Sequence, residues 1–262
     1  MVSKRKREEI DNIIREAKKN RIMRFKVAVD ENELDYVRRI IIDSRITKKD
    51  IDESSIIEEI ITKGPECMKI IEYLVEQGAN INLPNPNHRN LTPINNVASS
   101  LHLGENDHKN MLEKLINLGA DINIPDQNLN TPLLNCIIYT RSEDSIEFLI
   151  EQGAILSAKN DEGLTALHYA SMYDLPRIVS KILQLDFDHS KAKDNFGLTP
   201  MVYAIEADCE KVVKEILMLS ESKIDLIIKN NDNGFNALEL ALAKKDQRCN
   251  PRMVKMILYH KL

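Results

Sequence analysis

The sequence predicts an all-α solenoid of about seven helix-turn-helix units, joined by short hairpin-like turns and ended by atypical terminal units. Three observations support this fold: a threonine motif that recurs about every 34 residues, a Gly-Ala motif that follows the same period, and apolar residues at helical spacing between the two. One such unit cannot bury its apolar face alone, so consecutive units are expected to stack on one another.

The threonine motif is clearest in the stretch DEGLTALHYASMYDLPRIVSKIL, which covers residues 161–183. Related motifs lie one period before it, in NTPLLNC, and one period after it, in LTPMVYA. More distant copies are LTPINNV and FNALELA. The residues at the threonine position of the five copies are Thr92, Thr131, Thr165, Thr199 and Asn236. This regular recurrence indicates repeated units rather than a single site.

The Gly-Ala motif marks a second fixed point in each unit. It reads GANIN from Gly78, GADIN from Gly119 and GAILS from Gly153. Between the two motifs lie paired apolar segments with helical spacing, so each unit is expected to hold two helices. In the unit that follows Thr165, the apolar residues on one side are Ala170, Ile178, Val179, Ile182 and Leu183.

These motifs closely resemble the ankyrin repeat, which combines an Asp- and Gly-containing turn, Thr-Pro-Leu-His-x-Ala, and a second helix ending in Leu-Leu-x-x-Gly-Ala. The matching stretches here are NPNHRNLTPINNVA, PDQNLNTPLLNC, NDEGLTALHYA, KDNFGLTPMVYA and NDNGFNALELA. The resemblance covers most of residues 22–262. We expect a charged capping helix over residues 1–21 and an ankyrin-repeat domain over 22–262. The approximate repeats are 22–50, 51–82, 83–123, 124–157, 158–190, 191–227 and 228–262.

The turn before each threonine departs from the repeat pattern in two places. Gly163, Gly197 and Gly234 occupy the turn position that is expected to need a positive φ. Asn90 and Leu129 occupy it in the two earlier copies. Because Asn tolerates a positive φ and Leu does not do so readily, the turn at Leu129 is expected to be distorted.

Composition excludes several classes of protein. The chain has 36 Lys and Arg against 41 Asp and Glu, a net charge of −5, so nucleic acid is not an expected partner. No apolar run approaches the length of about 18 residues that a membrane span needs, and the start, MVSKRKREEIDN, lacks the apolar run of a secretory signal. We therefore expect a soluble cytoplasmic protein without membrane contact. The KRKR run at 4–7 fits a nuclear import signal or the solvated face of a capping helix.

The four cysteines and the histidines give no strong sign of catalysis. Cysteines at positions 67, 136, 209 and 249 match neither a zinc pattern nor a disulfide framework, so free thiols are expected. His168 is either a general base or, as the resemblance implies, a scaffold residue that hydrogen-bonds between neighbouring repeats. His102, Glu105 and His108 fit no zinc-enzyme motif, and Gly104 and Asn106 favour a solvated insertion over 99–109. We expect no catalytic residue, no metal and no cofactor.

The resemblance implies that partners bind at the hairpin tips and on the first helix of each repeat, where the repeat leaves residues variable. The tip positions are Arg89, Gln127, Asn128, Asp161, Glu162, Asn195 and Phe196, and the helix positions are Ile138, Tyr139, Met172, Tyr173 and Glu206. Phe196 is the most informative of these, because an aromatic residue at a solvated tip is typical of a binding hot spot. The alternative is that its ring folds back onto the neighbouring hairpin.

Two functions are compatible with these observations. The leading hypothesis is a non-catalytic adaptor, monomeric when free, that binds a peptide or helix of another protein in its concave groove. An Ile-, Asn- and Lys-rich composition suits an AT-rich genome, so a viral or symbiont host-interaction factor is a plausible subtype. The alternative is a targeting or regulatory subunit of an enzyme complex, with catalysis in a partner chain or at the 99–109 insertion.

Overall fold

The computed structural model describes residues 19–29, 32–219, 239 and 251–259, which fall into two compact units, Met1–Asp121 (unit 1) and Ile122–Leu262 (unit 2). Both units are built of helices, which confirms the all-α fold class. No helix in the described ranges is long and apolar enough to cross a bilayer. Most of the predicted capping helix, the KRKR run, Gly234 and Cys249 lie outside the described residues.

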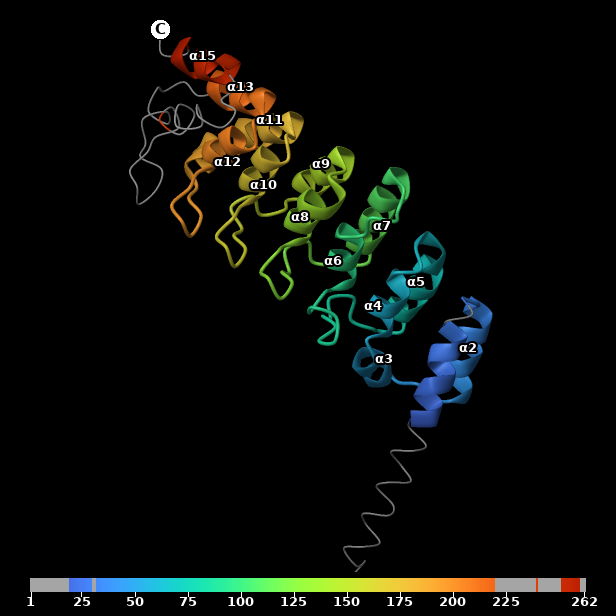
Figure 1. Ribbon diagram of the computed structural model, residues 1–262. Coiled ribbons are helices and arrows are strands. Elements are labelled where there is room, and N and C mark those ends of the chain that lie inside the picture. The colour runs from blue at the N-terminus through green and yellow to red at the C-terminus, as the bar shows by residue number, and fades with distance from the viewer. Residues whose placement is uncertain (1–18, 30–31, 220–238, 240–250, 260–262) are drawn as a thin grey trace, which may run out of the picture. The chain divides into compact units, whose positions relative to one another are not determined.

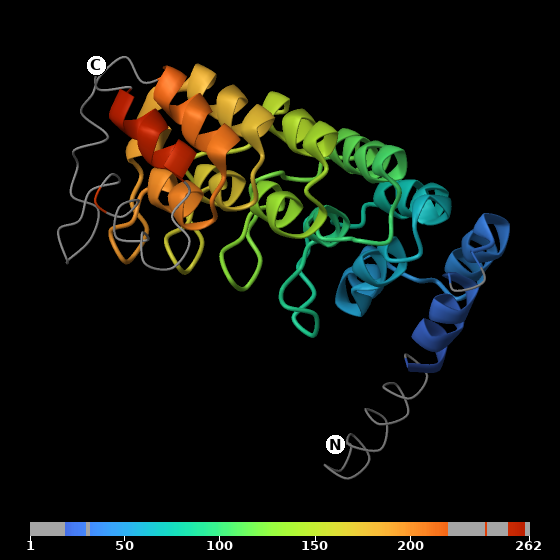
Figure 2. The same cartoon turned by 45° about the horizontal axis from the view of Figure 1, so that its top comes forward.

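The described residues of unit 2 form three consecutive helix pairs and, at 251–259, a further helix. The first helices of the pairs lie side by side, the second helices do the same, and the connecting hairpins project from one side (Figures 1 and 2). The pairs are α8 (Pro132–Asn135) with α9 (Glu143–Glu151), α10 (Ala166–Met172) with α11 (Pro176–Leu185), and α12 (Pro200–Glu206) with α13 (Glu210–Leu219). A π-helical segment, η2 (Cys136–Thr140), continues α8, a 3-10 segment, η3 (Phe187–Lys191), follows α11, and α15 spans Pro251–Tyr259.

Unit 1 begins with less regular elements and continues with two helix pairs. Residues 19–29 are helical, and α2 (Leu34–Asp43) and α3 (Lys48–Ser54) follow. The pairs are α4 (Ile56–Ile61) with α5 (Met68–Glu76), and α6 (Pro93–Ala98) with α7 (Glu105–Asn117). A 3-10 segment, η1 (Pro65–Cys67), lies between α4 and α5. Because α7 begins at Glu105, the expected loop over 99–109 is wrong for residues 105–109, and only 99–104 connect the two helices.

The expected core residues are buried. Ala170, Ile178, Val179, Ile182 and Leu183 are each at most 4% exposed, which confirms the helical spacing seen in the sequence. A fully buried aliphatic side chain stabilises a fold by about 1.5–3 kcal/mol. Aromatic residues make up only 5% of the chain, so the core depends mainly on these repeated aliphatic positions.

Threonines cap the first helices α6 and α8. The hydroxyl of Thr92 accepts a hydrogen bond from the backbone N–H of Asn95, and that of Thr131 accepts one from Leu134. Each bond satisfies a backbone donor that the start of a helix leaves unpaired. A proline follows directly in both cases, at the position where its missing N–H costs nothing.

Glycines end three of the second helices. Gly78, Gly119 and Gly153 have φ values of 92°, 90° and 91°, a conformation that only glycine adopts without strain. The alanine after each glycine donates its N–H to a leucine carbonyl in the last turn of the helix, at 2.9–3.1 Å. The Gly-Ala motif of the sequence is therefore a helix-ending motif.

The hairpins of unit 2 share one hydrogen-bond arrangement. A short polar side chain, from Asp126, Asn160 or Asp194, accepts bonds from the backbone N–H groups two and four residues further along the chain. The third residue after it has a positive φ: 59° at Leu129, 80° at Gly163 and 75° at Gly197. The expected distortion at Leu129 is therefore wrong, because Leu129 keeps both the left-handed conformation and the bonds of the turn.

This geometry predicts that Leu129→Gly stabilises the protein. A left-handed conformation costs a residue with a β-carbon about 1–2 kcal/mol, and glycine removes this cost. Glycine also makes the unfolded chain more flexible, which offsets only part of that gain. We expect a net gain of about 0.5–1 kcal/mol in the free energy of unfolding, measured by urea denaturation. A neutral or lower value would contradict the left-handed turn.

The matched control is Gly163→Ala at the equivalent position of the next hairpin. A β-carbon at Gly163 would lie 2.5 Å from Oδ1 and 2.8 Å from the backbone N of Asn195. The neighbouring hairpin would have to move, so this variant is expected to lose about 2 kcal/mol or more.

Candidate functional site

Three hairpin tips of unit 2 are joined into one row by hydrogen bonds. The backbone N–H of Asp161 donates to the carbonyl of Asn128 at 3.1 Å, which links the first tip to the second. The backbone N–H of Asn195 donates to the carbonyl of Glu162 at 3.1 Å, and its side-chain amide donates to the carbonyl of Asp161 at 2.8 Å. We call residues 127–129, 161–162 and 195–196 the tip row.

Most predicted tip residues are exposed in this row. Gln127, Asp161, Glu162 and Asn195 are exposed, and Asn128 is half-buried. Phe196 is 70% exposed, so its ring does not fold back onto the neighbouring hairpin. Its backbone is nevertheless fixed, because its N–H donates to Asp194 Oδ1 at 2.9 Å. The row thus presents an aromatic side chain to solvent from a rigid support.

The helix positions form a second cluster in unit 2. The guanidinium of Arg141 lies 4.2 Å from the ring centre of Tyr173, and the rings of Tyr173 and Tyr169 stack at 6.1 Å. Ile138 and Met172 are half-buried, whereas Tyr139 and Glu206 are exposed. Arg89, exposed with a φ of 51°, belongs to a hairpin of unit 1.

The sequence did not reveal Arg141, because the first helix of its repeat contains one extra residue. The left-handed residue that ends this helix lies ten positions after Thr131, at Arg141, but nine positions after Thr165, at Asp174. The π-helical segment Cys136–Thr140 absorbs the extra residue. Counting back from the second helix, instead of forward from the threonine, would have shown the insertion.

His168 is a scaffold residue, as the resemblance implied. It is fully buried, and its Nδ1 accepts the backbone N–H of Thr165 at 3.1 Å. The proton is therefore on Nε2, which donates to the carbonyl of Leu198 in the next hairpin at 3.1 Å. Burial lowers the pKa of His168, so the ring is neutral. With both nitrogens engaged, it has no free position for general-base catalysis.

The His102, Glu105 and His108 group does not converge. His108 is only 2% exposed on α7, whereas His102 and Glu105 are exposed. Across the described residues, no group of three or more His, Cys, Asp or Glu side chains is arranged to hold a metal ion. Cys67, Cys136 and Cys209 are free and buried, and burial raises the pKa of each thiol, which keeps it unreactive.

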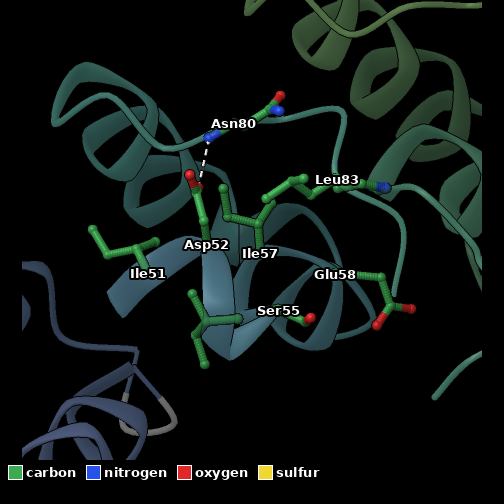
Figure 3. A pocket seen from close by; sticks show the side chains of 9 residues that line it. Ile51, Asp52, Ser55, Ile57, Glu58, Asn80 and Leu83 are labelled. Carbon is green, nitrogen blue, oxygen red and sulfur yellow. Dashed lines mark hydrogen bonds between the residues drawn. The ribbon is translucent and has the colours of Figure 1, made fainter. Parts of the chain in front are cut away.

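Unit 1 contains a small, shallow depression beside α3 and α4 (Figure 3). Its two carboxylates point apart and are already paired. Asp52 accepts the backbone N–H of Asn80 at 2.9 Å. The depression is lined by Ile51, Asp52, Ser55, Ile56, Ile57, Glu58, Asn80, Leu83 and Pro93. Because both carboxylates are already paired and most of the other lining residues are apolar, the depression does not indicate a ligand site.

Glu58 is a buried charge of unit 1 that is held by three hydrogen bonds. Its carboxylate is 3% exposed and accepts bonds from the amides of Asn85 at 2.6 Å and Asn96 at 2.7 Å and from His88 Nδ1 at 2.7 Å. Asn85 and His88 belong to the hairpin that precedes α6, and Asn96 lies on α6 itself. Glu58 therefore ties this hairpin to two helix pairs, which is a structural task.

An open groove of about 730 Å³ lies along the second helices of unit 2, lined by Glu147, Pro176, Arg177, Ser180, Lys181, Gln184 and Glu215. Arg177 pairs with Glu147 at 2.6 Å and with Asp144 at 3.5 Å, and Lys181 pairs with Glu151 at 3.0 Å. Because charges of both signs satisfy one another, the groove resembles a solvated helix surface more than a reaction site.

Comparison with known proteins identifies the repeats. Residues 97–192 match the family model for ankyrin repeats, in three copies. Residues 97–192 are therefore ankyrin repeats. No curated protein matches the chain. Ankyrin repeats are generally protein-protein interaction modules, and proteins built from them are typically non-catalytic scaffolds. This confirms the resemblance drawn from the threonine and Gly-Ala motifs.

The ankyrin match ends at residue 192, just before Asp194, which closes the third hairpin of the tip row. That hairpin nevertheless has the same geometry as the one at Asn160. Both have the polar side chain that accepts two backbone N–H groups, and both have a glycine with positive φ. Phe196 therefore occupies the tip of a hairpin with the same geometry as a hairpin of the matched repeats, although it lies outside the matched residues.

Burial of His168 predicts an acid-sensitive ankyrin domain. The unfolded chain takes up a proton on each histidine as pH falls below about 6.5, whereas burial lowers the pKa of folded His168 and of folded His108. Their contribution to stability is thus complete above pH 6.5 and is lost as pH falls through that value. Each histidine contributes up to about 1.4 kcal/mol between pH 7.5 and pH 5.5, measured by urea denaturation at both pH values.

The test variant is His168→Asn, since Asn95 fills the equivalent position after Thr92 and donates to its hydroxyl. This variant should lose less stability than the parent between pH 7.5 and pH 5.5, because only His108 remains. If the loss is the same in both proteins, His168 does not resist protonation in the folded state.

The contacts of Glu58 predict a large effect of Glu58→Gln. The glutamine side chain has the same shape, but an N–H₂ group replaces one carboxylate oxygen. At least one of the three donors, on Asn85, His88 or Asn96, then loses its acceptor. We expect a loss of about 2 kcal/mol in urea denaturation, with faster proteolysis of the 85–91 hairpin.

Glu59→Gln is the matched control on the same helix. Glu59 is exposed and pairs with Lys26 at 2.7 Å, so its loss should cost less than about 1 kcal/mol. Equal effects of the two variants would show that burial and the three bonds of Glu58 do not matter.

Proposed function

We propose that this ankyrin-repeat protein is a non-catalytic adaptor that binds a partner protein through the tip row and the adjoining first helices of unit 2. The observation that carries the proposal is Phe196, which is 70% exposed at a hairpin tip. An aromatic side chain left in solvent by a folded domain costs solubility and is characteristic of a binding hot spot.

Rigidity of the tips supports the same proposal. Backbone bonds within each hairpin and between neighbouring hairpins fix the row before any partner arrives. A preorganised surface loses little conformational freedom on binding, so more of the contact energy appears as affinity. The tip row therefore suits the recognition of a folded or extended segment.

The helix cluster extends the proposed surface. Ile138, Tyr139, Met172, Tyr173 and Glu206 occupy the positions that the sequence assigned to partner contact. The stack of Arg141 on Tyr173 holds the phenol ring in one orientation, which favours a specific contact over a loose apolar one. The net charge of −5 supports a protein partner rather than nucleic acid.

The alternative, an enzyme subunit with catalysis at the 99–109 insertion, gains no support from the geometry of that segment. His108 is buried in the core of unit 1, and His102 and Glu105 are not joined by a third ligand. The host-interaction subtype rests on composition alone and is not part of this proposal.

Removal of the aromatic side chain at the tip should weaken partner capture strongly. Phe196→Ala and Phe196→Ala with Tyr173→Ala are expected to weaken binding at least about 30-fold, the effect of losing one hot-spot side chain. The measurement is a quantitative pull-down from the native cell type, followed by titration of the captured partner against each purified variant.

Leu185→Ala on α11 and Met218→Ala on α13 are the matched controls. Both side chains are more than half exposed and lie on second helices, so their loss should leave capture unchanged. If Phe196→Ala behaves like these controls, the tip row is not the binding surface.

A further inference from the structure

The middle tip of the row carries two acidic side chains without a basic partner. Asp161 and Glu162 are both exposed, and neither forms an ion pair with any residue of the described ranges. The nearest lysine in sequence, Lys159, donates its ammonium group to the carbonyl of Lys193 at 2.8 Å instead. The row therefore presents two carboxylates that only solvent neutralises.

Apolar side chains lie on the tips to either side of these carboxylates. Leu129 is 50% exposed on the preceding tip, and Phe196 is 70% exposed on the following one. The backbone bonds from Asp161 to Asn128 and from Asn195 to Glu162 fix the order of the three tips. The surface thus alternates from apolar to acidic to apolar along the row.

We propose that the partner segment carries a Lys or Arg next to an apolar side chain, so that its charge lies against Asp161 and Glu162 and its apolar group against Phe196. The inference rests on the proposed function and adds the chemistry of the partner. Complementary charge raises the association rate and excludes acidic competitors, while burial of the apolar groups supplies affinity. A neutral or acidic segment would leave both carboxylates desolvated without compensation.

The test uses the full-length chain and a library of random peptides of about twelve residues displayed on phage. Selection in about 50 mM salt is expected to enrich peptides with Lys or Arg within three positions of Phe, Leu, Ile or Trp. Synthetic copies of these peptides should bind Asp161→Asn/Glu162→Gln about tenfold more weakly than the parent, since each lost charge contact weakens binding severalfold. Higher salt should also weaken the binding of these peptides to the parent, because it screens the attraction between the charges.

A variant with the same change in net charge separates local contact from general attraction. Glu76→Gln/Glu113→Gln removes two exposed carboxylates from α5 and α7 of unit 1, and it should bind the peptides as the parent does. Equal weakening by both double variants would overturn the inference, as would enriched peptides without basic residues or no enrichment at all.

Phe196→Ala tests the binding surface separately from the basic chemistry of the partner. Peptides that need Phe196 but bind equally well without the carboxylates would leave the proposed binding surface intact and refute the basic partner. Peptides that are indifferent to Phe196→Ala would refute the tip row itself, and the inference with it.

Discussion

The functional surface of this protein depends on one hydrogen-bond arrangement, in which a short polar side chain accepts two backbone N–H groups inside its own hairpin. Asp126, Asn160 and Asp194 each make these bonds, and the hairpins they close are then linked from tip to tip through main-chain groups. Because the closing side chain is buried and the linking groups belong to the backbone, apart from the side-chain amide of Asn195, the other side chains at the tips take no part in these bonds. Leu129, Asp161, Glu162 and Phe196 are therefore available for recognition at little cost to stability.

Much of this architecture could be predicted from the sequence, because its determinants are local. A threonine before a first helix, a glycine after a second helix and a buried histidine three residues after the threonine all act within a few residues of themselves. Phe196 could be placed at a tip for the same reason. The contacts of Glu58 could not be foreseen, since its partners lie 27, 30 and 38 residues away and belong to no motif. The conformation of Leu129 was predicted wrongly, because residue preference was weighed without the two bonds that Asp126 contributes to the same turn.

Two different chemistries secure a hairpin to neighbouring helices in the two units. In unit 2 a neutral imidazole bridges Thr165 and the carbonyl of Leu198, and it works only while it carries one proton. In unit 1 a buried carboxylate collects two amides and one imidazole from the hairpin and from α6. The imidazole of His168 forms neutral hydrogen bonds of fixed direction, whereas the carboxylate of Glu58 accepts bonds from three donors. A repeat can therefore lose the consensus histidine and still fasten its hairpin, provided that the helix pair beside it supplies an acceptor.

The π-helical segment at Cys136–Thr140 bears on how this chain is aligned with others of its family. Thr131 and Thr165, on either side of it, keep the same separation as Thr165 and Thr199, so the extra residue in the helix is balanced by a shorter connection elsewhere in the repeat. An alignment anchored on the threonine pairs Tyr139 with Tyr173, whereas one anchored on the second helix pairs Tyr139 with Met172. Any profile of variable positions, and any graft of this surface onto a consensus scaffold, would thus be displaced by one residue across the helix that carries Arg141, although the lengths of the repeats agree.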